Sequence, residues 1–171
     1  MTKNALLACA KAVVRSAAEK SLTLATAESC TAGALTKLLA ESPGAGGTFL
    51  GGFVCYDKRF KQSVLQVPAE VLQAETAVSE RVAEAIAHGA SQACGADVAI
   101  AVTGVAGPDP DEDGNPVGLV HLMVVCSNGQ KRHARLQLGD LGPGLIKSRA
   151  VEEGLNLALA ALQHWDSREA S

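Results

Sequence analysis

The residues best suited to chemistry are a serine and a cysteine directly after a short β-prone run. Residues 22–27 alternate as a strand does, Ser29 and Cys30 follow, and residues 34–41 favour a helix. The first backbone N–H groups of a helix have no partner within it and form the positive end of its dipole, which attracts anions. A hydroxyl and a thiol at that point would suit acyl transfer, in which a nucleophile attacks and N–H groups bind the oxyanion.

A serine nucleophile needs a base, and Lys61 is the side chain that we identify for this role. A lysine can deprotonate a serine only if burial or a neighbouring cation lowers its pKa from about 10.4 toward neutrality. The positions of the four histidines favour surface or packing roles instead. The plainer alternatives are that Ser29 is a helix N-cap, which serine favours, and that Lys61 is solvated on a helix face.

Two further strand ends carry polar side chains or glycines. These residues are Tyr56, Lys58, Lys61, Thr103, Gly104 and Gly107. Ligands of open α/β sheets bind at the carboxyl ends of the strands, and a backbone without Cβ lets them approach closely. If neighbouring parallel strands present these ends, all three converge on one pocket. A plainer role for Tyr56 is that of an amphipathic residue with its hydroxyl in water.

The elements that must position these residues follow from hydrophobic periodicity and turn signals. Helices are predicted over residues 6–17, 34–41, 79–93 and 144–164, short helical turns over 58–76, and strands over 22–27, 50–56, 97–103, 117–126 and 131–138. Asn128-Gly129 is a strong hairpin signal between the last two strands. Helices that alternate with strands, together with one hairpin, predict an α/β fold: a three-layer α/β/α sandwich with a mixed, mostly parallel sheet.

An acidic segment over residues 109–114 (DPDEDG) imitates the first half of a calcium-binding EF-hand loop. The imitation fails because the twelfth position would be Val120 instead of a bidentate glutamate, and because the flanking segments are predicted strands. We interpret the segment as a solvated acidic loop and predict no metal site.

Composition limits the class of protein. Apolar residues make up 47% and charged residues 19% of the 171 residues, which predicts one globular domain over residues 1–171. A net charge of −3 and an aromatic content of 3% argue against nucleic-acid binding. Five dispersed cysteines are typical of reduced thiols, and no segment resembles a signal peptide or a membrane span. We therefore expect a cytoplasmic protein with no membrane partner.

Several motifs occur in a specific order and spacing. They are Thr26–Gly33 (TAESCTAG), Gly52–Tyr56 (GFVCY) with Lys61 five residues later, Ala77–Ser79 (AVS), Thr103–Pro108 (TGVAGP), Pro116–Gly118 (PVG) and Arg149–Ala150. Over about residues 6–165 the chain thereby resembles the CinA C-terminal domain family, whose characterised members are nicotinamide-nucleotide amidases.

The resemblance implies hydrolysis of the carboxamide of nicotinamide mononucleotide to nicotinate mononucleotide and ammonia, without metal or other cofactor. It implies that Ser29 is the nucleophile, Lys61 its general base and Tyr56 an aid to proton transfer. The substrate-binding residues it implies are Glu28, Cys30, Thr31, Thr103, Gly104, Gly107 and, for the phosphate, Arg149. Backbone N–H groups near Cys30 and Thr31 would bind the oxyanion. The partner would be a pyridine nucleotide, and the protein a homodimer or higher homo-oligomer.

The chain departs from the family pattern at basic positions near the expected site. Lys58 replaces an asparagine, Leu141 replaces an arginine, and Lys147 stands where the family has arginine. Lys58 would lower the pKa of Lys61 by like-charge repulsion. These departures keep two other hypotheses open: a nucleotide-binding or competence-associated interaction module without catalysis, and a thiol hydrolase that uses Cys30.

Overall fold

The computed structural model describes residues 2–165, so residues 1 and 166–171 of the predicted domain lie outside the described part. The helices are α1 (Lys3–Glu19), α2 (Ala34–Ala40), α3 (Lys58–Leu65), α4 (Ala69–Ala74), α5 (Glu80–Cys94) and α6 (Pro143–Gln163), with a 3-10 turn η1 (Ala45–Gly47). The strands are β1 (Leu24–Glu28), β2 (Phe49–Val54), β3 (Val98–Gly104), β4 (Leu119–Cys126) and β5 (Lys131–Gln137). The observed strand boundaries differ from the predicted ones by at most two residues.

The sheet is mixed, as predicted, with the strand order β2-β1-β3-β4-β5. β1 pairs in parallel with both β2 and β3, whereas β4 pairs antiparallel with β3 and β5. The β4–β5 hairpin turns at Asn128-Gly129, which confirms the turn signal. Because the three parallel strands are neighbours, their carboxyl ends meet at one edge of the sheet.

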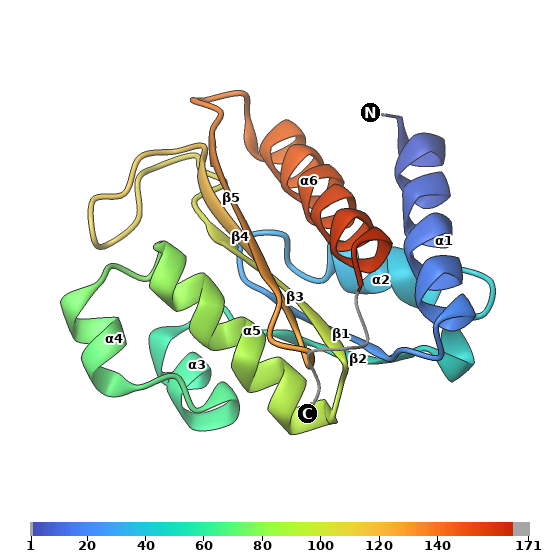
Figure 1. The fold of residues 1–171 in the computed structure, drawn as a ribbon. Helices are drawn as coiled ribbons and strands as arrows, with labels where there is room; N and C mark the ends of the chain where they lie inside the picture. Colours follow the sequence, from blue (N-terminus) through green and yellow to red (C-terminus); the bar gives the residue numbers. More distant parts are fainter. Residues whose placement is uncertain (1, 166–171) are drawn as a thin grey trace.

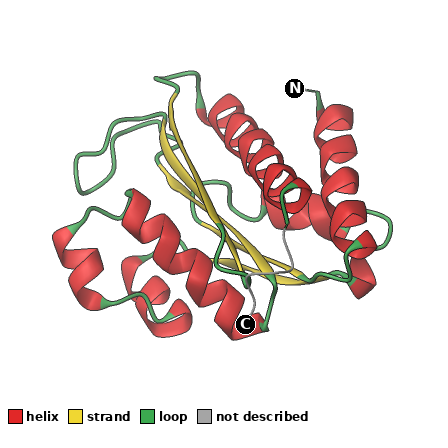
Figure 2. Ribbon diagram, in the orientation of Figure 1, coloured by secondary structure: helices red, strands yellow, loops and turns green. Residues whose placement is uncertain are grey.

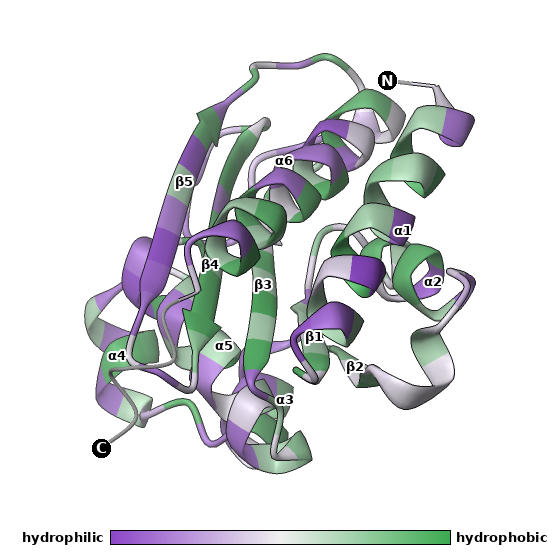
Figure 3. Ribbon diagram, turned by 45° about the vertical axis from the view of Figure 1, so that its right-hand side comes forward, coloured by the Kyte–Doolittle hydropathy of each residue, from purple (hydrophilic) through white to green (hydrophobic). Residues whose placement is uncertain are grey.

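Helices cover both faces of the sheet in three layers (Figure 1), which confirms the predicted architecture. α1, α2 and α6 pack on one face, and α5, with α3 and α4 against it, packs on the other (Figure 2). β3 and β4 lie between the layers and are almost entirely buried, as the apolar run over residues 97–103 predicts. β5 at the sheet edge is hydrophilic (Figure 3).

α3 is the element that carries Lys61, and local signals explain its bounds. The Asp57 side chain caps the helix by accepting a hydrogen bond from the Arg59 N–H at 2.7 Å. Lys61 and Leu65, one helical turn apart, are the buried residues of the helix, so the face that packs against α5 also faces the interior. α3 ends before Pro68, which is the N-cap of α4.

Gly52 of β2 lies close to the side chains of two threonines. A Cβ at this position would collide with the side-chain hydroxyls of Thr26 and Thr36. The glycine therefore makes room for buried threonines.

All five cysteines lie within the described residues and are free thiols. None of the helices between residues 2 and 165 combines the length and apolar content that a bilayer span requires.

Candidate active site

A cavity of about 600 Å³ opens at the carboxyl ends of β1, β2 and β3, which confirms the predicted convergence of three strand ends. Of the residues predicted to be functional, Ser29, Cys30, Tyr56, Lys61, Thr103, Gly104 and Gly107 line it, together with Lys58. The volume lies in the range of small-molecule sites. Glu28, Thr31 and Arg149 are not part of the lining.

The N-terminus of α2 does not present free N–H groups to a ligand, contrary to our expectation. The carboxyl oxygens of Glu28 accept hydrogen bonds from the N–H groups of Leu35 (3.1 Å) and Thr36 (2.7 Å). The Thr36 hydroxyl donates a third hydrogen bond at 2.5 Å. Glu28 is fully buried, so a carboxyl group of the chain itself occupies this helix end.

The turn over residues 29–33 separates β1 from α2 and leaves other N–H groups open. Ser29 is not a helix N-cap, because Gly33, with a φ of +90°, occupies that position. The Ser29 N–H donates to the Val102 carbonyl, whereas the N–H groups of Cys30 and Thr31 donate to no acceptor within the described residues. Of these two residues, Cys30 lines the cavity, whereas Thr31 is buried and does not.

Lys61 is buried with only 1% of its surface exposed, so the alternative of a solvated lysine is wrong. Its amine makes no hydrogen bond or ion pair within residues 2–165. Burial is the main cause that lowers the pKa of Lys61, and the nearby Lys58 ammonium acts in the same direction. The thiols of Cys55 and Cys30 raise it and oppose this shift in part.

The candidate nucleophile Ser29 and the candidate base Lys61 both line the cavity but are not hydrogen-bonded to each other. Ser29 is 7% exposed, and no hydrogen bond joins its hydroxyl to the Lys61 amine. Tyr56 stands at the cavity but is 79% exposed, in agreement with an amphipathic strand-end residue whose hydroxyl meets water. The structure thus brings all three side chains to one site.

Cys30 also lines the cavity, but its thiol is a poor nucleophile at neutral pH. Burial raises the pKa of Cys30 to about 12, and the nearby Glu28 carboxyl adds to the shift. Burial likewise raises the pKa of Cys55 to about 11. A nucleophilic thiolate requires the opposite environment.

The end of β3 contributes a further part of the cavity wall. The Thr103 hydroxyl donates a 2.8 Å hydrogen bond to the Ala77 carbonyl, so it holds a neighbouring loop in place. A Cβ on Gly104 would lie 2.7 Å from the Leu119 carbonyl oxygen, so only glycine fits here. Gly107 follows with a φ of +88°.

The basic residues of α6 differ in their placement. Arg149 lies outside the cavity lining, and its guanidinium pairs with Glu152 at 3.3 Å. Lys147 lines the cavity. Sequence reasoning identified Lys147 only as a departure from a family arginine, and its two-residue separation from Arg149 already puts the two side chains on different helix faces.

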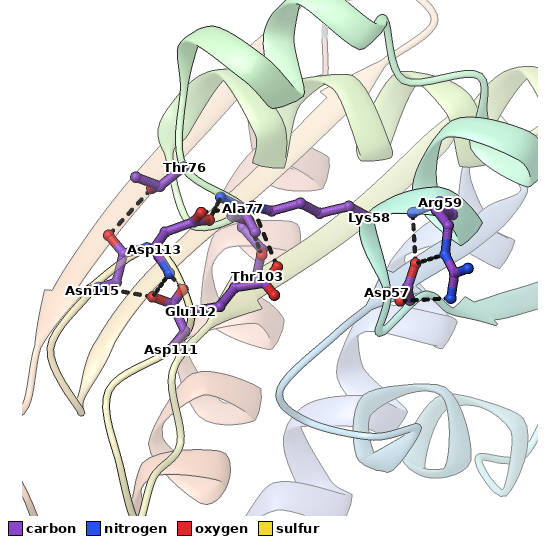
Figure 4. A network of polar contacts seen from close by, with 10 residues as sticks. All are labelled: Asp57, Lys58, Arg59, Thr76, Ala77, Thr103, Asp111, Glu112, Asp113 and Asn115. Atoms are coloured by element: carbon purple, nitrogen blue, oxygen red, sulfur yellow. Dashed lines mark hydrogen bonds and ion pairs between the residues drawn. The ribbon is translucent and has the colours of Figure 1, made fainter.

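The acidic segment over residues 109–115 is fixed by polar contacts instead of being simply solvated (Figure 4). Asp111 accepts hydrogen bonds from the N–H groups of Asp113 (3.1 Å) and Asn115 (2.8 Å). Asp113 in turn pairs with the Lys58 amine at 2.6 Å and accepts a 2.8 Å hydrogen bond from the Ala77 N–H. The segment is one rim of the cavity, which its sequence did not indicate.

Within residues 2–165, no three His, Cys, Asp or Glu side chains are grouped so that they could hold a metal ion.

The fold and the cavity define a three-layer α/β domain with a candidate active site at the carboxyl ends of its parallel strands. The chain matches the CinA C-terminal domain family over residues 7–162 and belongs to it. A CinA-like protein from Synechococcus sp. strain RCC307 is 43% identical over 149 residues, which are 86% of this chain and 36% of that protein. A CinA-like protein from Anaeromyxobacter dehalogenans is 42% identical over 151 residues, which are 88% of this chain and 36% of that protein. The chain thus spans about a third of the length of these relatives.

Solved structures with the same fold cover nearly the whole chain. The competence/damage inducible protein CihA from Agrobacterium tumefaciens superimposes with a TM-score of 0.87 at 36% identity, over 93% of this chain and 96% of that one. The competence damage-inducible protein A (ComA) from Klebsiella pneumoniae superimposes with a TM-score of 0.89 at 33% identity, over 94% and 99%.

Proposed function

We propose that this domain is a serine amidase that hydrolyses the carboxamide of nicotinamide mononucleotide to nicotinate mononucleotide and ammonia. The observation that carries the proposal is Lys61, a buried lysine that forms no ion pair with any residue from 2 to 165 and lines the same cavity as Ser29. Burying an amine without a counter-charge costs folding free energy, and its lowered pKa suits a general base.

In the proposed mechanism, the neutral Lys61 amine takes the proton of the Ser29 hydroxyl as Oγ attacks the carboxamide carbon. The N–H groups of Cys30 and Thr31 bind the oxyanion, and the Lys61 ammonium, assisted by Tyr56, returns a proton to the departing ammonia. Water then hydrolyses the acyl-enzyme ester with Lys61 again as base. Since the Ser29 hydroxyl and the Lys61 amine do not hydrogen-bond, substrate binding or one bridging water must connect them.

The remaining cavity residues would bind the nucleotide. Gly104 and Gly107 leave their backbone open to a ligand, and Lys147 is the cation best placed for the phosphate. Arg149 would need to leave Glu152 to reach it.

An assay of ammonia release from nicotinamide mononucleotide, nicotinamide riboside and nicotinamide tests the proposal. We expect turnover of the nucleotide only, with loss of activity in Ser29→Ala and in Lys61→Met. Lys131→Met is the matched control. Lys131 lies on β5, outside the cavity lining, and the substitution removes its exposed ion pair with Glu84 of α5. Full activity in Ser29→Ala would overturn the mechanism.

The second candidate is a nucleotide-binding or competence-associated interaction module without catalysis. Two observations favour it: no hydrogen bond joins Ser29 to Lys61, and Lys58, which replaces a family asparagine, is held by acidic side chains at the cavity rim. Calorimetric binding of nicotinamide mononucleotide without turnover would support this candidate, and clear turnover would exclude it.

A Cys30 thiol hydrolase is disfavoured by the raised thiol pKa. We expect Cys30→Ala to keep catalysis, with at most a change in KM, and complete inactivation would restore that mechanism.

A further inference from the structure

Two lysines of α3 stand three residues apart and meet different surroundings. The Lys61 amine has no hydrogen-bond or ion-pair partner in the described part of the chain, whereas the Lys58 amine lies 2.6 Å from Asp113 Oδ1 and 3.3 Å from Glu112 Oε1. Residues separated by three positions are neighbours on a helix surface, and both lysines line the cavity. Lys58 therefore connects the helix that carries the candidate base to the acidic rim.

The connection continues beyond Asp113 to the sheet (Figure 4). The second carboxyl oxygen of Asp113 accepts a 2.8 Å hydrogen bond from the Ala77 N–H, and the Ala77 carbonyl accepts one from the Thr103 hydroxyl at 2.8 Å. α3, the acidic rim, the loop at Ala77 and the end of β3 are thus joined by consecutive polar contacts. Each of these segments contributes to the cavity wall.

We propose that Lys58 is a positioning residue for Lys61, and that its bridge to Asp113 holds the mouth of the cavity in the arrangement in which the Lys61 amine faces the substrate. This inference rests on the amidase function proposed above. The bridge also explains why Lys58 can replace the family asparagine, because Asp113 neutralises the charge that Lys58 adds to the cavity.

The first turn of α3 carries exposed side chains next to Lys58. The Arg59 side chain is 91% exposed and Phe60 is 43% exposed, whereas the buried residues of the helix are Lys61 and Leu65. A bridge from Lys58 to another wall would therefore limit the motion of the first turn.

The bridge also sets the charges around the Lys61 amine. The titratable groups that act on it are Lys58 of α3, Asp57 at the N-cap of this helix, Cys55 after β2, Cys30 after β1 and Asp113 of the acidic rim. Lys58 disfavours the ammonium form of Lys61, whereas Asp113 favours it. Removing either partner breaks the same bridge but changes the protonation of Lys61 in opposite directions.

The experiment compares Lys58→Met, Asp113→Ala and the conservative Lys58→Arg, with Lys131→Met as the control. The acidic limb of the pH profile of kcat, which reports deprotonation of the base, is expected to move up by roughly 0.5 pH unit in Lys58→Met and down by a similar amount in Asp113→Ala. Lys58→Arg and the control should leave it in place. Exchange of the Ala77 amide proton, followed by NMR, should accelerate about tenfold in Lys58→Met and Asp113→Ala alike.

If the bridge had only a structural role, both variants would show faster amide exchange, but their acidic limbs would not move in opposite directions. If the wild-type protein hydrolyses the nucleotide and the acidic limb stays in place in both variants, or moves in the same direction in both, the inference is overturned and the amidase function stands. If the wild-type protein does not hydrolyse the nucleotide, NMR titration of the Lys61 amine in lysine-labelled protein measures the same shifts. Shifts of opposite sign would then support the inference about position and charge although the amidase function had failed.

Discussion

Glu28 and Lys61 are both almost completely buried, yet the protein treats the two side chains in opposite ways. Glu28 receives three hydrogen bonds from α2, and the Thr36 hydroxyl that donates one of them contacts the Thr26 hydroxyl at 2.7 Å. Since the Thr36 proton goes to Glu28, Thr26 must be the donor in that contact. Lys61 receives no such support.

The contrast between the hydrogen-bonded Glu28 and Lys61, which has no such partner among residues 2–165, distinguishes a buried polar group that stabilises the fold from one that we propose acts in catalysis. A buried group that is fully hydrogen-bonded stabilises one arrangement of the chain, whereas an unpartnered one reduces stability and keeps its reactivity. Lys61 lines the cavity, whereas Glu28, the last residue of β1, lies behind it and directly precedes the lining residue Ser29. Four predictions test this division.

The largest effect is expected from Lys61→Met, which keeps the length of the side chain and removes the amine. Turnover of nicotinamide mononucleotide should fall by about 10²–10⁴-fold, the usual contribution of a general base. The midpoint of urea unfolding should stay the same or rise, since no hydrogen bond of Lys61 is lost. A large loss of stability would mean that Lys61 is a structural residue like Glu28.

Glu28→Ala, unlike Lys61→Met, should lower the free energy of unfolding. It would leave the N–H groups of Leu35 and Thr36 and the Thr36 hydroxyl unpaired in the interior, at a cost of about 3–5 kcal/mol in the free energy of unfolding. Denaturant unfolding followed by circular dichroism measures this. Glu28→Gln keeps one acceptor and should cost less, and an unchanged stability in both variants would refute the structural role.

Gly52→Ala tests the threonines that support Glu28. The added methyl group would meet the hydroxyls of Thr26 and Thr36, so we expect a loss of about 1–3 kcal/mol in unfolding free energy. Gly46→Ala is the matched control, because a Cβ there meets nothing within 4 Å, and its effect should stay within about 0.5 kcal/mol. Equal effects at the two glycines would contradict the close packing.

The smallest effect concerns pH. Because the pKa of Lys61 is lowered in the folded state, the unfolded state binds more protons between that pKa and about 10.4, and the contribution of Lys61 to stability rises with pH across this window. The buried thiols of Cys30 and Cys55 act in the opposite direction, since their pKa values are raised. The stability difference between Lys61→Met and wild type is therefore the quantity to measure, and it should shrink as pH rises toward 10.4.

Much of the fold could be predicted because its signals are local. Apolar patterns predicted the strands, helical periodicity predicted the helix that begins after Ser79, and Asn128-Gly129 predicted the hairpin. The convergence of Ser29, Lys61 and Thr103 followed from the same patterns, because neighbouring parallel strands must end at one sheet edge.

The sequence by itself therefore determined the order of elements, the class of fold and the edge at which the site lies. Only the tertiary structure decided which groups at that edge are free. Glu28 occupies the helix end that a ligand was expected to use, Lys147 takes the place at the cavity that Arg149 was expected to hold, and Lys58 meets a carboxyl group 55 residues away. Periodicity arises from neighbours along the chain, whereas pairing of polar groups depends on distances that exist only after packing.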